Sequence, residues 1–332
     1  MSQARQTRNI DWYRTPLGRD TLRALNKRSD WKAFLQAGGH LALLGAIGTL
    51  AWHVQDRIYL LLPVLLLYGT CYVFLLNATH ELSHSSVFKT RWLNDFFLRT
   101  FCFLGWRSHI MFWTSHAEHH KYTLHRPDDL EVVLPRHPKA KELIQVTLFD
   151  PWTLYATIRK HILHSLGRLE GEWENHLFPA DQPDKHRRLI RWARFLLLGH
   201  AALVGTSLYF GLWLLPVLTT CGVFYGGWLR YLCNNTQHTG LQDDVADFRL
   251  CTRTVILSPL PRFLYWHMNF HIEHHMYAAV PCYNLGKLHQ LIKHELPPSP
   301  KGLWATWREI RAIGKKQQSQ PDYQYIPALP TA

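Results

Sequence analysis

Two long apolar stretches near the N-terminus set the first expectation for the fold. Residues 33–53 and 58–79 carry few polar side chains, and only a short polar link at 54–57 separates them. Each stretch is long enough to cross about 30 Å of hydrocarbon as a helix. The pattern therefore predicts a hairpin of two transmembrane helices with a tight, exposed turn.

A second apolar block at 195–232 is roughly twice the length that one crossing needs. Gly211 and Pro216 lie near its middle, where these residue types favour a turn between two helices. We therefore expect two further crossings, over 195–213 and 214–232. The predicted fold class is an all-α integral membrane protein with four transmembrane helices in two hairpins.

The remaining segments are polar, charged and rich in histidine. They cover 80–190 and 233–332, which predicts a helical cap outside the membrane. Segment 96–113 is nearly long enough to span, but its arginines and a histidine make it a poor span, so we interpret it as an interfacial or re-entrant helix. An even number of crossings then keeps the polar segments on one side, and residues 1–332 form a single domain.

The net charge of +13 bears on topology. Eight Lys and Arg residues lie in 1–32, and arginines 187, 188, 191 and 194 directly precede the second apolar block. Basic residues beside spans favour retention on the cytoplasmic side. We expect both termini and the cap to be cytosolic, at a bacterial inner membrane or the endoplasmic reticulum. A merely solvated basic surface is the alternative, and neither interpretation requires nucleic acid.

The six cysteines form no CxxC pair, so neither a disulfide framework nor a zinc ribbon is indicated. The chain instead concentrates histidine in three short motifs: HELSH at 80–84, HAEHH at 116–120 and HIEHH at 271–275. Spacings of three and four residues place side chains on one side of a helix. Each motif is expected to present two or three imidazoles to one point: His80 and His84; His116, His119 and His120; His271, His274 and His275.

A fourth contribution is expected from NNTQH at 234–238, where the second apolar block ends. It holds His238, with Asn234 four residues earlier. Eight or nine histidines exceed what one structural zinc site uses, so two metal ions are the natural interpretation. Imidazole suits iron, copper, zinc and nickel, and ligand type alone does not select among them. A metal transporter would carry its ligands inside the crossing helices, whereas these motifs lie outside them.

The three motifs, in this order and setting, resemble the histidine boxes of the integral-membrane fatty acid desaturases, over roughly residues 40–290. That superfamily also includes lipid hydroxylases, sphingolipid desaturases and carotenoid hydroxylases or ketolases. The resemblance implies two Fe ions, O2 as co-substrate and hydrogen abstraction from an unactivated C–H bond. It implies that the eight box histidines are iron ligands, that His238 is an additional ligand, and that Asn234 reaches a metal through water.

The chain departs from some members of the superfamily. Its first box is HxxxH, whereas animal acyl-CoA desaturases usually have five-spaced histidines; HELSH followed by SSVF is more similar to sphingolipid and bacterial lipid desaturases. No HPGG motif, ferredoxin-like cysteine set or GxGxxG is present. We expect electrons from a separate protein of ferredoxin, rubredoxin or cytochrome b5 type. The predicted activity is desaturation of a fatty acyl chain, with hydroxylation at the same centre as the alternative and metal transport as a less favoured one.

Acidic residues near the boxes are candidates for orienting the imidazoles through their second ring nitrogen. These are Glu118, Glu273 and either Asp128 or Asp129, and ordinary solvated acids are the alternative interpretation. Five further histidines are not expected to be iron ligands: His125, His161, His164, His200 and His267.

Overall fold

The computed structural model describes residues 8–330, which form helices and loops with only isolated β-bridges. The helices are α1 (Arg19–Leu25), α2 (Asp30–His53), α3 (Ile58–Tyr72), α4 (Leu75–Ser83), α5 (Arg91–Leu104), α6 (His109–Tyr122), α7 (Ala140–Thr147), α8 (Pro151–Ser165), α9 (Gly171–Leu177), α10 (Pro183–Tyr209), α11 (Leu214–Leu218), the 3₁₀ turn η1 (Gly222–Phe224), α12 (Trp228–Asn234), α13 (Phe248–Cys251), α14 (Pro259–Leu264), α15 (His271–Met276), α16 (Cys282–Ile292) and α17 (Gly302–Ser319). The all-α prediction is confirmed.

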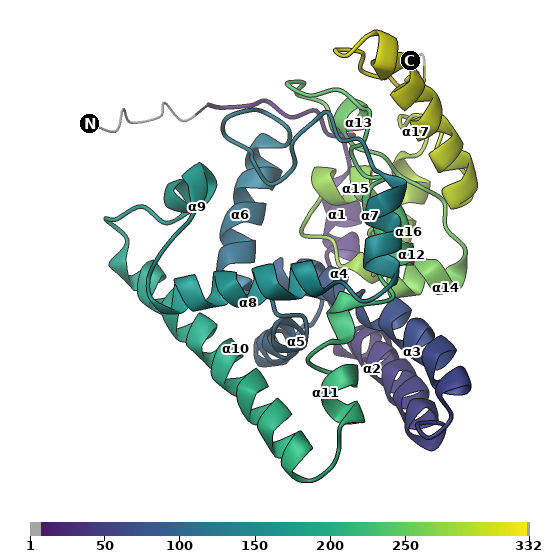
Figure 1. Ribbon diagram of the computed structural model, residues 1–332. Helices are drawn as coiled ribbons and strands as arrows, with labels where there is room; N and C mark the ends of the chain where they lie inside the picture. The colour runs from purple at the N-terminus through teal and green to yellow at the C-terminus, as the bar shows by residue number, and fades with distance from the viewer. Residues whose placement is uncertain (1–7, 331–332) are drawn as a thin grey trace.

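The first predicted hairpin is present (Figure 1). Helix α2 begins after Ser29, whose hydroxyl accepts the backbone N–H of Lys32 at the helix N-terminus. Helix α3 leads through a short irregular turn into α4, so that Ile58–Ser83 runs nearly as one helix. Both α2 and this second stretch are long and apolar enough to cross a membrane.

The second apolar block differs from the predicted pair of helices. Its first half belongs to α10, which starts well before the apolar stretch and ends at Tyr209. Its second half, 214–232, is not one helix but is divided into α11, η1 and α12. The interruption has a packing cause: Gly226 adopts φ +71°, and a Cβ there would lie 2.5 Å from the backbone nitrogen of Thr70 on α3. Two further crossings therefore remain a prediction.

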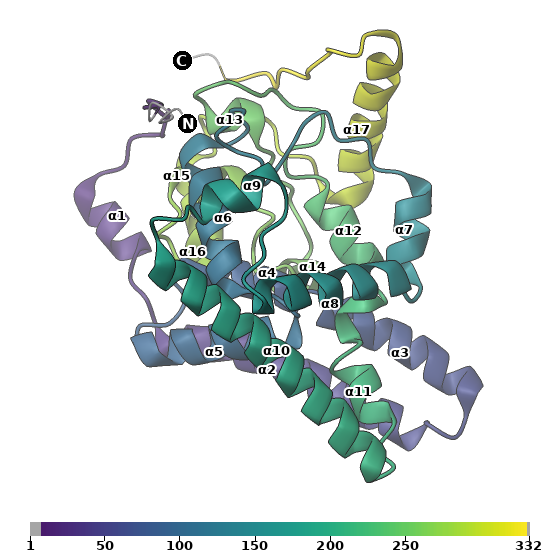
Figure 2. The same ribbon diagram turned by 60° about the vertical axis from the view of Figure 1, so that its left-hand side comes forward.

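Segment 96–113 is also divided, because α5 ends at Leu104 and α6 begins after Ser108. The 14 residues of α5 extend about 21 Å, which is shorter than the hydrocarbon thickness. Helix α5 packs against α4 and lies across the direction of α6 (Figure 2). The segment therefore does not form a single spanning helix.

The apolar hairpin and the polar helices occupy different ends of the molecule. In both views α2, α3 and α11 lie at one end and α13 and α17 at the other, with α4, α6 and α15 between them (Figures 1 and 2). One buried core, which includes Phe74, Leu75, Trp266, Ile272 and Leu285, joins the end of the hairpin to α15 and α16. This core fixes the first and third histidine boxes relative to each other. All six cysteines are free.

Candidate metal centre

The nine predicted histidines gather into two neighbouring clusters. Cluster A consists of His80, His84, His116, His120 and His274, and cluster B of His119, His238, His271 and His275. Within each cluster the potential ligand nitrogens all lie within 4.8 Å of one another. Each cluster could therefore hold one metal ion.

The clusters do not coincide with the sequence boxes, which corrects the expectation that each box points to one place. On α6, His116 and His120 are four residues apart and share a face, and they enter cluster A, while His119 enters cluster B. On α15 the assignment is reversed: His271 and His275 enter cluster B, while His274 enters cluster A. Each of the two HxxHH motifs thus supplies histidines to both clusters.

The distances between ring nitrogens fit ligands arranged around an ion. In cluster A, Nε2 of His120 lies 3.0 Å from Nε2 of His116 and 3.1 Å from Nε2 of His274. In cluster B, Nε2 of His271 lies 3.1 Å from Nε2 of His238 and 3.2 Å from Nε2 of His275. Two nitrogens at right angles, each about 2.1 Å from one ion, are separated by about 3.0 Å.

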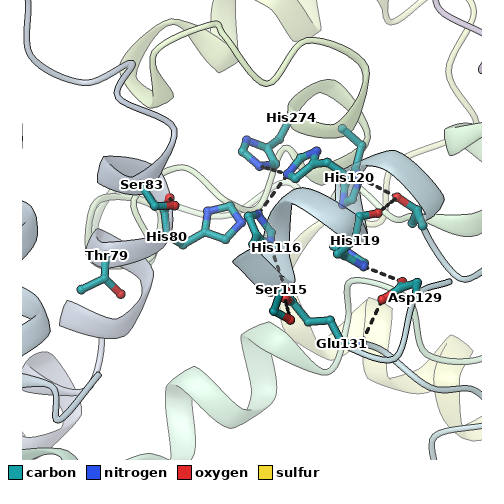
Figure 3. Close-up of polar contacts among 12 residues, drawn as sticks. Thr79, His80, Ser83, Ser115, His116, His119, His120, Asp129, Glu131 and His274 are labelled. Carbon is teal, nitrogen blue, oxygen red and sulfur yellow. Dashed lines mark hydrogen bonds and ion pairs between the residues drawn. The ribbon is translucent and has the colours of Figure 1, made fainter. Parts of the chain in front are cut away.

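The opposite ring nitrogens, Nδ1, have partners that fix the orientation of several imidazoles (Figure 3). Within cluster A these partners are carboxylates: Nδ1 of His80 donates to Glu81 at 3.0 Å and Nδ1 of His116 to Glu131 at 2.8 Å. Such contacts select the tautomer whose Nε2 is free to bind a metal. Nε2 of His80 is indeed buried without a hydrogen-bond partner, as is Nε2 of His84.

Cluster B is oriented in the same way by a more varied set of partners. Nδ1 of His119 donates to Asp129 at 2.7 Å, that of His238 to the Cys251 carbonyl at 2.9 Å, and that of His275 to the Thr123 hydroxyl at 3.2 Å. The Asp129 carboxylate is fully buried and also accepts backbone N–H groups of residues 124 and 131. It is therefore a fixed acceptor for His119.

The predicted acidic partners are only partly correct. Asp129 orients an imidazole as expected, whereas Glu118 forms no hydrogen bond with a histidine within residues 8–330. Glu273 is also buried, but it contacts His289 and accepts the Thr254 hydroxyl at 2.5 Å. Its contacts tie α15 to α16 and to the preceding loop rather than orienting a ligand.

Two carboxylates in the site, Glu81 and Glu131, were not predicted. Glu81 lies inside the first box, directly after His80, so the sequence could have indicated its contact with a box histidine. Glu131 reaches His116 across 15 residues through the loop that follows α6, and no short motif indicates that contact.

The electrostatic environment favours neutral imidazoles. Burial lowers the pKa of His84 to about 4 and that of His238 to about 3. Burial likewise holds the pKa of His116, His120, His271, His274 and His275 well below the usual range. His119 differs: burial alone would lower its pKa, but the adjacent Asp129 carboxylate outweighs burial and raises it. Neutral imidazole is the form that binds metals.

Asn234 lies beside the clusters, and its side-chain oxygen accepts a hydrogen bond from Asn77 at 3.2 Å. The histidines excluded at the sequence level take other partners. His161 contacts the Trp106 carbonyl and His164 contacts Glu174, while His200 stacks on Trp106. His125 and His267 also belong to neither cluster.

A cavity of about 580 Å³ opens onto both clusters. Its lining includes His80 and His116 of cluster A and His119, His238 and His271 of cluster B. Apolar side chains also line the cavity: Leu76, Trp106, Met111, Phe112, Leu177 and Met268. The cavity can therefore hold a molecule that has both apolar and polar parts, directly against the clustered imidazoles.

Comparison with known proteins identifies the family of the chain. Residues 57–307 match the family model described as fatty acid desaturase. The chain is also 26% identical over 276 residues to a protein of Caenorhabditis elegans described as Delta(5) fatty acid desaturase fat-4, covering 73% of this chain and 59% of that relative. It therefore spans less than two thirds of the relative's length. Since the family model matches most of the chain, the protein belongs to the fatty acid desaturase family.

Proposed function

We propose that the protein desaturates a fatty acyl chain or lipid with O2 at a di-iron centre held by histidine. The observation that carries the proposal is the pair of buried imidazole clusters facing one cavity, in a chain of this family. Imidazole ligands suit iron, and no cysteine belongs to either cluster. Cluster A would hold one ion and cluster B the other, and Asn234, which lines the same cavity, would act through water.

The residues around the clusters have definable tasks in this proposal. Glu81, Glu131 and Asp129 hold the Nδ1 protons of three histidines, so that the Nε2 atoms face inward. Seven of the nine imidazoles are buried, which limits the access of bulk water to them. Bound iron would supply O2 activation and the oxidising power to remove hydrogen from an alkyl chain.

The remaining parts of the proposal concern substrate, electron source and location. The relative's description names a fatty acid desaturase, and the apolar part of the cavity lining suits a hydrocarbon chain. Electrons would come from a separate ferredoxin, rubredoxin or cytochrome b5 type protein. Helix α2 and the Ile58–Ser83 stretch would anchor the chain in the membrane, with the clusters on the cytosolic side.

Lipid analysis of an expressing host tests the activity. Desaturation gives a product two hydrogens lighter than its precursor, whereas hydroxylation adds one oxygen. His119→Ala and His274→Ala, one from each cluster, should abolish the product and lower the iron content of the purified protein while leaving membrane insertion intact. His294→Ala, a change at an exposed histidine outside the clusters, is the matched control. Full turnover by either cluster variant would contradict the assignment of that residue.

A further inference from the structure

Two arginines in the cavity lining lack an acidic partner. Arg107 follows α5 and Arg230 lies on α12, and both line the cavity that opens onto the histidine clusters. No carboxylate within residues 8–330 lies at ion-pairing distance from either guanidinium group. A charge removed from bulk water is costly unless an opposite charge or hydrogen-bond acceptors compensate it.

Both guanidinium groups are held against the same turn of α4. Nη1 of Arg107 donates to the Leu76 carbonyl at 2.9 Å and to the Thr79 hydroxyl at 3.1 Å. Nε of Arg230 donates to the side-chain oxygen of Asn77 at 2.9 Å. These contacts position the two groups within one helical turn of each other and directly before His80 of cluster A.

The contacts leave most of the donors of each guanidinium group unused. An arginine carries five N–H donors, and Nη2 of Arg107 and both terminal nitrogens of Arg230 have no hydrogen-bond partner in the part of the chain that the structure describes. The ring of Phe112 covers one face of the Arg107 guanidinium, 4.4 Å from its centroid. The planar groups are thus oriented, with donors available to a bound molecule.

The other charged side chains of the cavity are already engaged. Glu174 pairs with Lys160 at 2.5 Å and with His164 at 2.9 Å. Glu131 accepts the Ser115 hydroxyl at 2.5 Å and contacts His116 at 2.8 Å. Glu131 interacts electrostatically with Arg107 across the cavity, but it is hydrogen-bonded to Ser115 and His116 and forms no ion pair with either arginine. The two arginines therefore keep a localised positive charge in the cavity.

We propose that Arg107 and Arg230 form a subsite for the anionic oxygen group of the substrate, a carboxylate or a phosphate ester carried by a hydrocarbon chain. Guanidinium groups match the geometry of both anions. The apolar lining around Trp106 and Leu177 would receive the chain. The inference rests on the proposed function, and it places the polar end of the substrate in the same cavity as the clusters.

Binding of matched amphiphiles to the purified full-length protein tests this subsite without turnover. The probes are dodecanoate, dodecyl phosphate and the uncharged methyl dodecanoate, titrated calorimetrically in nanodiscs of uncharged lipid. We expect at least one anion to bind about tenfold or more tightly than the ester, since charge-assisted hydrogen bonds favour it. The anion with the larger preference identifies the carboxylate or the phosphate as the group recognised.

Arg230→Gln and Arg107→Gln should each remove most of this preference for the anion and leave ester binding unchanged. Arg107→Lys keeps the positive charge and a donor toward α4, so it should retain part of the preference. Arg191→Gln, at an exposed arginine of α10 outside the cavity, is the matched control. Thermal unfolding of each variant separates loss of the subsite from loss of the fold.

Equal binding of the ester and both anions by the unaltered protein would overturn the proposal. So would a selective loss of anion binding in Arg191→Gln, or retained preference in both glutamine variants. Failure of the proposed function is distinguishable: anion-selective binding without any new lipid product in cells would reject desaturation and keep the subsite. A desaturated product together with unselective binding would do the reverse.

Discussion

Clusters A and B both consist of histidines, but they differ in the number of potential ligands. Cluster A has five histidines drawn from all three boxes, and His84 and His120 in it are only partly buried. Cluster B has four histidines, all buried, and one of them, His238, comes from outside the boxes. Cluster A can therefore lose a ligand and still match the number in cluster B, whereas cluster B has no spare imidazole.

The carboxylates that hold His119 in cluster B and His116 in cluster A also differ in burial, although Glu81, the acceptor for His80 in cluster A, is buried as well. The acceptor for His119 in cluster B is the fully buried Asp129. The acceptor for His116 in cluster A is Glu131, whose side chain is 21% exposed. The more deeply buried carboxylate is the more rigid acceptor, so His119 should depend more strongly on Asp129 than His116 does on Glu131.

Removing a ligand from each cluster gives the largest expected contrast. On the proposed function, His238→Ala should reduce bound iron from two ions to one per chain and lower desaturation more than about 100-fold, because loss of an outer partner alone costs about 10–100-fold. His84→Ala leaves four imidazoles in cluster A, and we expect nearly two ions and a smaller loss, on the order of tenfold. Elemental analysis measures the ratio, and anomalous scattering from crystals identifies the site that is lost.

Equal losses of iron in the two variants would show that the fifth histidine of cluster A is as necessary as any other. His137→Ala, at an exposed histidine, is the control for nonspecific effects of removing an imidazole.

Local sequence patterns predicted those features of the fold that depend on local geometry. The hairpin expected over 33–53 and 58–79 is observed as α2 and the α3–α4 stretch, because an apolar run of this length favours a helix that satisfies its own backbone hydrogen bonds. The run at 214–232 is as apolar but not continuously helical, since close packing of Gly226 on α3 overrides helix formation. Hydropathy reports the environment of a segment and not its backbone path.

The metal site, too, could be predicted from the sequence only in part. Spacing identified all eight box histidines, but the division of each HxxHH motif between two clusters depends on where α4, α6 and α15 meet. The Glu131 contact requires the loop after α6 to return to that helix. Such long-range placements arise from the tertiary packing, which no short motif encodes.

Neutralising the carboxylates that hold the Nδ1 protons tests the same difference between the clusters. We expect a smaller loss of metal binding than from removing a histidine. Asp129→Asn should weaken metal binding by cluster B about 10–100-fold, since the neutral amide is a poorer acceptor for His119. Glu131→Gln should weaken cluster A less, because its carboxylate is partly exposed. Competition with a chelator of known affinity, followed by iron analysis, measures both changes.

Asp184→Asn is the control for loss of a carboxylate, because its side chain is 86% exposed on α10. A larger effect of Glu131→Gln than of Asp129→Asn would reverse the proposed order of rigidity.

The smallest expected effect concerns a single neutral hydrogen bond in cluster B. The Thr123 hydroxyl donates to the His119 carbonyl at 2.6 Å and lies 3.2 Å from Nδ1 of His275, from which it can accept. Thr123→Val keeps the shape but removes the acceptor, leaving a buried N–H unsatisfied. A neutral hydrogen bond contributes about 0.5–1.5 kcal/mol, so iron affinity at cluster B should fall roughly 2–10-fold. Thr123→Ser retains the hydroxyl and should bind iron as the unaltered protein does. An unchanged affinity in Thr123→Val would mean that packing against Phe248, whose ring lies 5.2 Å from that of His275, suffices to orient this imidazole.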